Sequence, residues 1–161
     1  MAGVRSNTVE TIEGVRVRTA NPAERLQLEA LQMRAAMANA GDASQLSAHP
    51  EAVQVPDALL RAGRVRVAEA ANAIVGFAVL LPVASGACEL DGLFVAPEVW
   101  RRGVGRVLLE ACLSQARSER ARCIHATVNS HAAGFYLANG FTHVRWVKTE
   151  FGPASEMRVP I

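Results

Sequence analysis

Two glycines and three arginines are gathered within six residues, and residues of these types at this spacing could bind a phosphate group. The stretch, residues 101–106, reads Arg-Arg-Gly-Val-Gly-Arg and lies between an apolar strand-like segment, 89–95, and the apolar residues of a helix. The N–H groups of a first helical turn have no intrahelical acceptor, the helix dipole is positive there, and glycine leaves the backbone open to an anion. The pattern predicts a pyrophosphate site. A glycine-rich helix start that only packs closely is the alternative.

Two other phosphate-binding loops do not fit this stretch. A P-loop requires a lysine followed by serine or threonine after its second glycine, whereas Arg106 and Val107 follow here. The dinucleotide-binding fingerprint requires a third glycine, and Leu108 occupies that position. The stretch therefore belongs to neither class.

Two carboxylates precede the glycines and could take a proton from a substrate. Glu89 and Asp91 are two residues apart, so in a regular strand both side chains point to one face. Two acids on one face can raise a pKa and share a proton path. The same pair could equally be a solvated strand edge or a point of attraction for a cationic substrate, and the residues leave these alternatives open.

The composition predicts one globular, cytoplasmic domain. The chain has 161 residues, half of them hydrophobic, and a formal net charge of +2, which is too small to argue for nucleic acid. No apolar run reaches the roughly 20 residues of a membrane span, and residues 1–13 lack the apolar core of a signal peptide. Three cysteines and four histidines follow no metal spacing, so we expect no metal site and structural roles for these residues.

The expected elements alternate between strands and helices. We expect a flexible lead-in at residues 1–14 and one domain at 15–161. The sequence Asn21-Pro22-x-Glu24 is a strong helix start. Strands are expected at 15–19, 64–70, 74–83, 88–95, 122–128, 141–148 and 156–159, the last two joined through Gly152-Pro153. Further helices are expected at 55–60, 103–117 and 130–139, the last capped by Ser130 and closed by Gly140. The strand–helix–strand unit at 88–128 predicts a parallel pair of strands.

The glycine stretch resembles the acyl-CoA loop of the GNAT (general N-acetyltransferase) superfamily, written Gln/Arg-x-x-Gly-x-Gly/Ala. Gly103 and Gly105 match its glycines, whereas Trp100 stands at the Gln/Arg position, a departure that leaves the backbone amides unaffected. Residues 129–141 match the family's C-terminal segment, Asn-x-x-Ala-x-x-Phe-Tyr-x-x-x-Gly-Phe, at every fixed position. The order of expected elements also resembles this family from 15 to 161. The resemblance implies an α/β (α+β) fold with a mixed central sheet of about six to seven strands and about four helices.

The resemblance also implies roles for individual residues. Backbone N–H groups near Phe94 and Val95 would hold the pantetheine chain of acetyl-CoA and polarise its thioester, because their strand separates from the strand at 123–128. Asn129 would bind the pantetheine arm. Tyr136 would be the general acid for the departing thiolate, with aromatic packing as the alternative. The pyrophosphate would lie mainly on the backbone of Arg101, Arg102, Gly103, Val104, Gly105 and Arg106.

Glu89 lies eleven residues before Trp100, the offset of the base glutamate in histone-acetylating members of this family. The resemblance therefore implies Glu89 as general base, directly or through water, with Asp91 as the second candidate.

The activity expected from the resemblance is direct transfer of an acetyl group from acetyl-CoA to a primary amine of a small molecule or peptide. No cysteine or serine is placed as a nucleophile. The alternative is a non-catalytic acyl-CoA-binding regulatory module of the same fold. Residues 26–60 are expected to shape the acceptor pocket. We expect no membrane partner. We also expect no nucleic acid as a partner, because no aromatic residues are interleaved with the arginines. A homodimer is left open.

Overall fold

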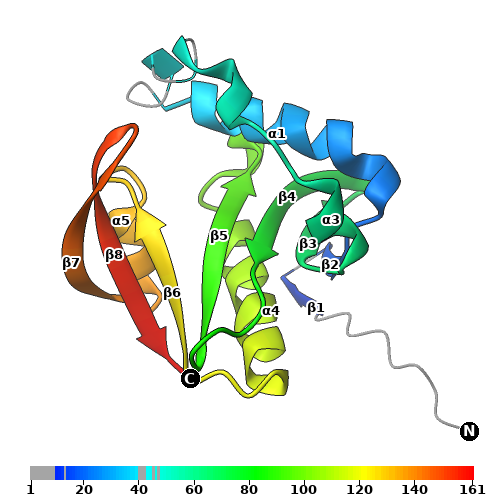
Figure 1. The fold of residues 1–161 in the computed structure, drawn as a ribbon. Helices are drawn as coiled ribbons and strands as arrows, with labels where there is room; N and C mark the ends of the chain where they lie inside the picture. The colour runs from blue at the N-terminus through cyan, green and yellow to red at the C-terminus, as the bar shows by residue number, and fades with distance from the viewer. Residues whose placement is uncertain (1–9, 13, 40–42, 45, 47) are drawn as a thin grey trace, which may run out of the picture.

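The structure, a computed structural model, describes residues 10–12, 14–39, 43, 44, 46 and 48–161. Within these residues, eight strands form one sheet in the order β1-β2-β3-β4-β5-β6-β8-β7 (Figure 1). The strands are β1 (Glu10–Ile12), β2 (Val15–Thr19), β3 (Val65–Ala70), β4 (Ala73–Leu80), β5 (Ala87–Val95), β6 (Cys123–Val128), β7 (Thr142–Thr149) and β8 (Gly152–Pro160). Only β5 and β6 pair in parallel, which confirms the predicted mixed sheet and its parallel pair.

The helices cover both faces of the sheet. They are α1 (Arg25–Met37), α3 (Asp57–Arg61), α4 (Val104–Ser118) and α5 (Ala133–Ala138), with short 3-10 turns at Pro22–Glu24, Pro50–Ala52 and Pro97–Val99. No helix among the described residues is both long and apolar enough to cross a membrane.

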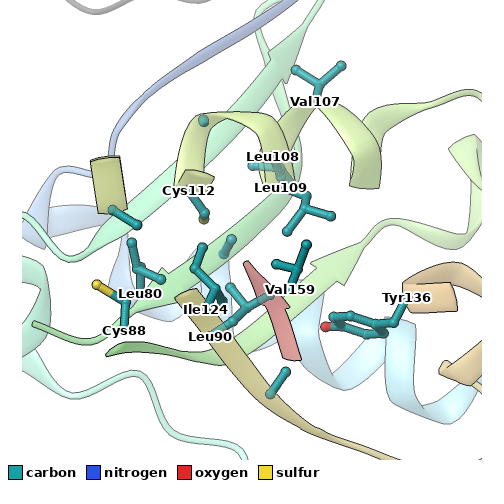
Figure 2. Packing of buried hydrophobic residues seen from close by; sticks show 14 of the residues in the cluster. Leu80, Cys88, Leu90, Val107, Leu108, Leu109, Cys112, Ile124, Tyr136 and Val159 are labelled. Atoms are coloured by element: carbon teal, nitrogen blue, oxygen red, sulfur yellow. The ribbon is translucent and has the colours of Figure 1, made fainter. Parts of the chain in front are cut away.

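Alternate residues of β4 divide the core into two clusters. Ala78 and Leu80 belong to the cluster that contains the buried face of α4, part of which Figure 2 shows. Phe77 and Val79 belong to the other cluster, with Leu28 of α1 and other buried residues of α1 and α3. This two-residue alternation is what a strand buried on both faces requires. The sheet is therefore packed on both faces at β4, and β5 is the next strand in the sheet.

The predicted helix start at Asn21 is confirmed in detail. The Asn21 side-chain oxygen accepts the Ala23 N–H at 2.9 Å, and the Glu24 carboxylate accepts the Asn21 N–H at 2.7 Å. These reciprocal bonds satisfy donors that the first turn leaves unpaired. The buried residues Leu28, Leu31 and Ala35 then share one face of α1.

Three local predictions were wrong. Residues 10–12 of the expected lead-in form β1, because backbone pairing with the edge of β2 needs little sequence pattern. Ser130 does not cap a helix: α5 begins at Ala133, and its N-cap residue makes no side-chain cap. Gly152-Pro153 is not a connection, because pairing with β7 continues through both residues, and the chain turns at 150–151 instead.

An ion pair between buried Arg64 and half-buried Glu119 fastens the start of β3 to the end of α4. The Arg64 guanidinium, in a residue only 7% exposed, bonds both carboxylate oxygens of Glu119, and its Nε donates to the Leu80 carbonyl at 2.7 Å. The hydrogen bonds from Arg64 hold the pKa of Glu119 below its ordinary value. A carboxyl whose folded-state pKa is lowered stabilises the protein above its unfolded pKa, and that stability is lost as pH falls through the folded value.

Replacing Glu119 with glutamine should therefore lower the free energy of unfolding at pH 7 by about 1–3 kcal/mol, because a buried guanidinium loses its anion. The variant should also lose less stability than the wild type between pH 7 and pH 3. Urea unfolding at several pH values measures both effects. Glu110→Gln, which breaks the exposed pair with Arg106, is the control and should cost only a few tenths of a kcal/mol. An unchanged pH dependence for Glu119→Gln would contradict this role.

Candidate active site

Strands β5 and β6 separate along their length and leave an opening in the sheet. They pair only at Ala87–Cys123, Cys88–Ile124 and Glu89–His125. Beyond these residues β5 continues to pair with β4, as far as Gly76 with Val95, but it has no partner on its other side (Figure 1). The predicted separation of the two strands is therefore present.

The backbone of Val95 faces this opening. The Ala96 N–H donates to the Val75 carbonyl at 2.8 Å and therefore points toward β4. The Phe94 carbonyl also lies on the β4 side, 3.0 Å from the position a Cβ would take on Gly76. Since successive residues of a strand direct their backbone groups to opposite sides, those of Val95 point away from β4. Of the two residues predicted to present amides, Val95 does so.

The regular alternation of β5 is interrupted at Asp91. Val79 pairs with Gly92 and Leu80 with Leu90, so Asp91 is the extra residue of a β-bulge. After the bulge Leu93, rather than Gly92, packs against the cluster that holds Leu90. The prediction that Glu89 and Asp91 share a face assumed that side chains alternate regularly along the strand. The bulge interrupts this alternation at Asp91, so the assumption does not hold there.

A cavity of about 450 Å³ lies at the opening, a size typical of small-molecule sites. Segments far apart in the sequence line it, from α1, β5, the turn before α4, and the stretch that leads into α5. The lining residues are Ala35, Ala36, Asn39, Leu93, Phe94, Val95, Trp100, Arg101, Asn129, His131, Ala132, Phe135 and Tyr136. Five predicted site residues are thus brought together: Phe94, Val95, Arg101, Asn129 and Tyr136.

The start of α4 carries free backbone donors. Its N-cap, Gly103, has no capping side chain, and the first intrahelical bond runs from the Val107 N–H to the Gly103 carbonyl at 3.1 Å. The N–H groups of Val104, Gly105 and Arg106 therefore have no acceptor within the helix. Gly103 adopts φ +85°, which favours glycine. These features fit an anion at the helix start.

Gly105 also has a packing role. A Cβ at this position would lie 3.1 Å from the Phe135 ring and 3.6 Å from Leu93. Both neighbours line the cavity. The alternative interpretation of the glycines, that they allow close packing, is therefore correct for part of the role of Gly105. A side chain at this position would project between Phe135 and Leu93.

Tyr136 is buried among aromatic rings. It makes edge-on contacts with Phe135 and Phe141, at centroid distances of 5.2 and 5.0 Å. Its phenol oxygen points away from α5 toward the strands (Figure 2), and burial raises the pKa of Tyr136 to about 12. Tyr136 lines the cavity, and among the described residues its hydroxyl has no hydrogen-bond partner. The phenol therefore stays protonated at neutral pH and can donate a hydrogen bond.

Asn129 holds the stretch that leads into α5. Its side-chain oxygen accepts the Ala132 N–H at 3.0 Å, a bond that the expected Ser130 cap does not make. The residue lines the cavity as well. Asn129 thus shapes the chain at one wall of the cavity.

The two predicted acids lie outside the lining of the cavity. Glu89 is half-buried at the last pair between β5 and β6, opposite His125. Asp91 is exposed at the bulge. Among the described residues neither carboxylate makes a hydrogen bond or an ion pair. Both stand on the strand that leads to Val95, at the closed end of the opening.

Trp100 and His131 also line the cavity, and the sequence indicated no functional role for either. Trp100 is 39% exposed and donates its indole N–H to the Val95 carbonyl at 2.7 Å. His131 is exposed beside Asn129. Two features of the sequence could have indicated that these residues lie at the site. Trp100 departs from the loop pattern, and His131 lies within the second motif.

Two of the cysteines, Cys88 and Cys112, are not activated nucleophiles. Cys88 and Cys112 are buried, and desolvation raises the pKa of each thiol, to about 12 for Cys112. The thiolate is the reactive form, and a raised pKa keeps the thiol protonated at neutral pH. A mechanism through an acylated cysteine has no support at these two positions.

Comparisons with known proteins identify the family and the fold. A family model described as an acetyltransferase (GNAT) domain matches residues 61–143. Ard1 from Thermoplasma volcanium shares the fold with a TM-score of 0.71 and 20% identity, over 92% of this chain and 98% of that one. PaiA N-acetyltransferase from Thermoplasma acidophilum, solved in complex with coenzyme A, gives 0.71 and 17%, over 91% and 99%. Ribosomal-protein-alanine N-acetyltransferase from Brucella melitensis gives 0.67 and 20%, over 90% and 99%. No curated protein matches the chain.

Proposed function

Because the chain belongs to the GNAT acetyltransferase family, we propose that it transfers an acetyl group from acetyl-CoA directly to a primary amine of a small molecule or peptide. One observation carries this proposal. The Val95 N–H, the uncapped glycine start of α4 and the Tyr136 phenol lie around one opening in the sheet. The similarity to a structure that contains coenzyme A supports the choice of cosubstrate.

The residues of the opening would hold acetyl-CoA along its length. Its pyrophosphate would accept hydrogen bonds from the first-turn N–H groups of α4, with Arg101 and Arg102 adding positive charge. Its pantetheine arm would run along the free side of β5, where the Val95 N–H would donate to the thioester carbonyl. A donor aimed at that carbonyl stabilises the negative charge that develops on the oxygen during attack.

The transfer itself needs two proton movements. The amine nitrogen forms a bond to the acetyl carbon and loses a proton, the carbon–sulfur bond breaks, and the sulfur leaves as a thiolate that takes up a proton from water. With its pKa near 12, Tyr136 would donate a hydrogen bond to that sulfur, since complete transfer to a thiolate of ordinary pKa, about 8.5, is uphill. Glu89 would accept the amine proton through water, and Asp91 is the second candidate.

A panel of amines tests the proposal. The protein is incubated with acetyl-CoA and each of several polyamines, aminoglycosides, amino acids and short peptides, and free thiol and acetylated product are both measured. We expect thiol release that depends on one class of amine, with one acetylated product per thiol. Binding of acetyl-CoA without transfer to any amine would favour the regulatory-module alternative.

Replacing Glu89 with glutamine should depress turnover at neutral pH and shift the activity profile to higher pH. An amine acceptor arrives protonated, since an alkylammonium pKa is near that of lysine, about 10.4, so the base matters least where free amine is abundant. Asp91→Asn is the matched control and should mainly raise the apparent KM for the amine. The pH–rate profiles of both variants with one good acceptor provide the measurement. Loss of turnover in Asp91→Asn alone would reverse the two roles.

A further inference from the structure

The indole of Trp100 ties the end of β5 to the turn that leads into α4. Its Nε1 donates to the Val95 carbonyl at 2.7 Å, across five residues of chain. The Val95 backbone points into the opening, so this bond lies at the cavity, and Trp100 itself lines the wall. Two further backbone bonds, Val99 N–H to Ala96 carbonyl and Trp100 N–H to Pro97 carbonyl, tighten the same turn.

The residue that follows this turn is held in an unfavourable conformation. Arg101 has φ +63°, in the left-handed region, and it lines the same cavity. A left-handed conformation costs a residue with a side chain roughly 1–2 kcal/mol and persists only where surrounding contacts enforce it. The Trp100 bond is the side-chain contact that fixes the residue immediately before Arg101.

We propose that Trp100 is a positioning residue that holds Arg101, and with it the entry to α4, in place for the pyrophosphate of acetyl-CoA. The inference rests on the proposed cosubstrate. Indole is a rigid donor with a single N–H, so it occupies one lone pair of the Val95 carbonyl and leaves the Val95 N–H for the ligand. Trp100 acts through Arg101 and not on the reacting atoms.

Replacing Trp100 with phenylalanine keeps an aromatic ring in the wall and removes the N–H. Loss of one such hydrogen bond should weaken acetyl-CoA binding about three- to tenfold, with kcat at saturation within about twofold of the wild type. Calorimetric titration gives the affinity, and initial rates give KM and kcat. Trp146→Phe is the matched control, because Trp146 is 69% exposed and lies outside the cavity lining. The affinity of this variant for acetyl-CoA should equal that of the wild type.

A double-mutant cycle with Arg101→Ala separates positioning from simple packing. Arg101→Ala should weaken binding, and adding Trp100→Phe should weaken it little further, since both changes remove the same contribution. Independent, multiplying effects would overturn the inference, as would wild-type affinity in Trp100→Phe. If the wild type itself fails to bind acetyl-CoA, the proposed function falls, and this inference falls with it.

Discussion

Gly105→Asp is expected to abolish the rise in Tm that acetyl-CoA gives the wild type. A ligand that binds only the folded state raises Tm by mass action, so the shift reports binding. An aspartate here would project between Leu93 and Phe135, into the cavity, and would place a negative charge beside the N–H groups expected to hold the pyrophosphate. Charge repulsion and loss of space then act together, and the expected shift is zero at millimolar acetyl-CoA.

Two control variants separate this effect from the packing role of Gly105. Gly105→Ala adds only the Cβ, 3.1 Å from Phe135, so it should lower Tm without ligand but keep most of the acetyl-CoA shift. Gly134→Asp adds the same charge where nothing lies within 4 Å of the new Cβ, and its shift should remain. A full shift in Gly105→Asp would show that the anion does not bind at this helix start.

Tyr136→Phe is expected to lower kcat by about 10²-fold, the lower end of the effect of removing one hydrogen-bond donor to a developing negative charge. The substitution keeps the ring and its contacts with Phe135 and Phe141, and removes only the hydroxyl that would face the departing sulfur. Affinity for acetyl-CoA and Tm should therefore change little. Steady-state rates, supported by single-turnover measurements in case product release is slow, provide the test. Unchanged single-turnover rates would leave Tyr136 with a packing role alone.

The raised pKa of Tyr136 adds a pH dependence to this prediction. Because burial raises the value to about 12, the phenol remains protonated across pH 7–10. The wild-type rate should therefore show no loss from tyrosine ionisation in that range, and the ratio of wild-type to Tyr136→Phe rates should stay constant. A ratio that falls toward one near pH 10 would mean that the phenol ionises there.

Local signals in the sequence were enough for much of the fold. The alternating valines of β2 and β3, the Asn21 helix start and the apolar run of β4 each depend on neighbours within a few residues, and each is present. The glycine stretch likewise begins α4 as predicted, one residue later than expected. The parallel pairing of β5 with β6 followed from the helix between them.

Features that depend on contacts between distant segments could not be predicted. The bulge at Asp91 arises from the register of β5 against β4, so a period of two gave the wrong basis for pairing Glu89 with Asp91. The hydrogen bond from Trp100 to Val95 depends on the conformation of the turn between them, which the sequence pattern does not specify. Asn129, rather than Ser130, caps the approach to α5 because the chain reaches helical geometry only at Ala133.

The most direct test of the central claim is amide hydrogen exchange, followed residue by residue by NMR, with and without acetyl-CoA. The Val95 N–H faces the opening, and the N–H groups of Val104, Gly105 and Arg106 have no intrahelical acceptor, so all four should exchange freely in the free protein. Acetyl-CoA should protect these amides selectively. The absence of protection at millimolar acetyl-CoA, or protection confined to residues outside 93–106 and 129–136, would contradict the assignment of this opening as the acetyl-CoA site.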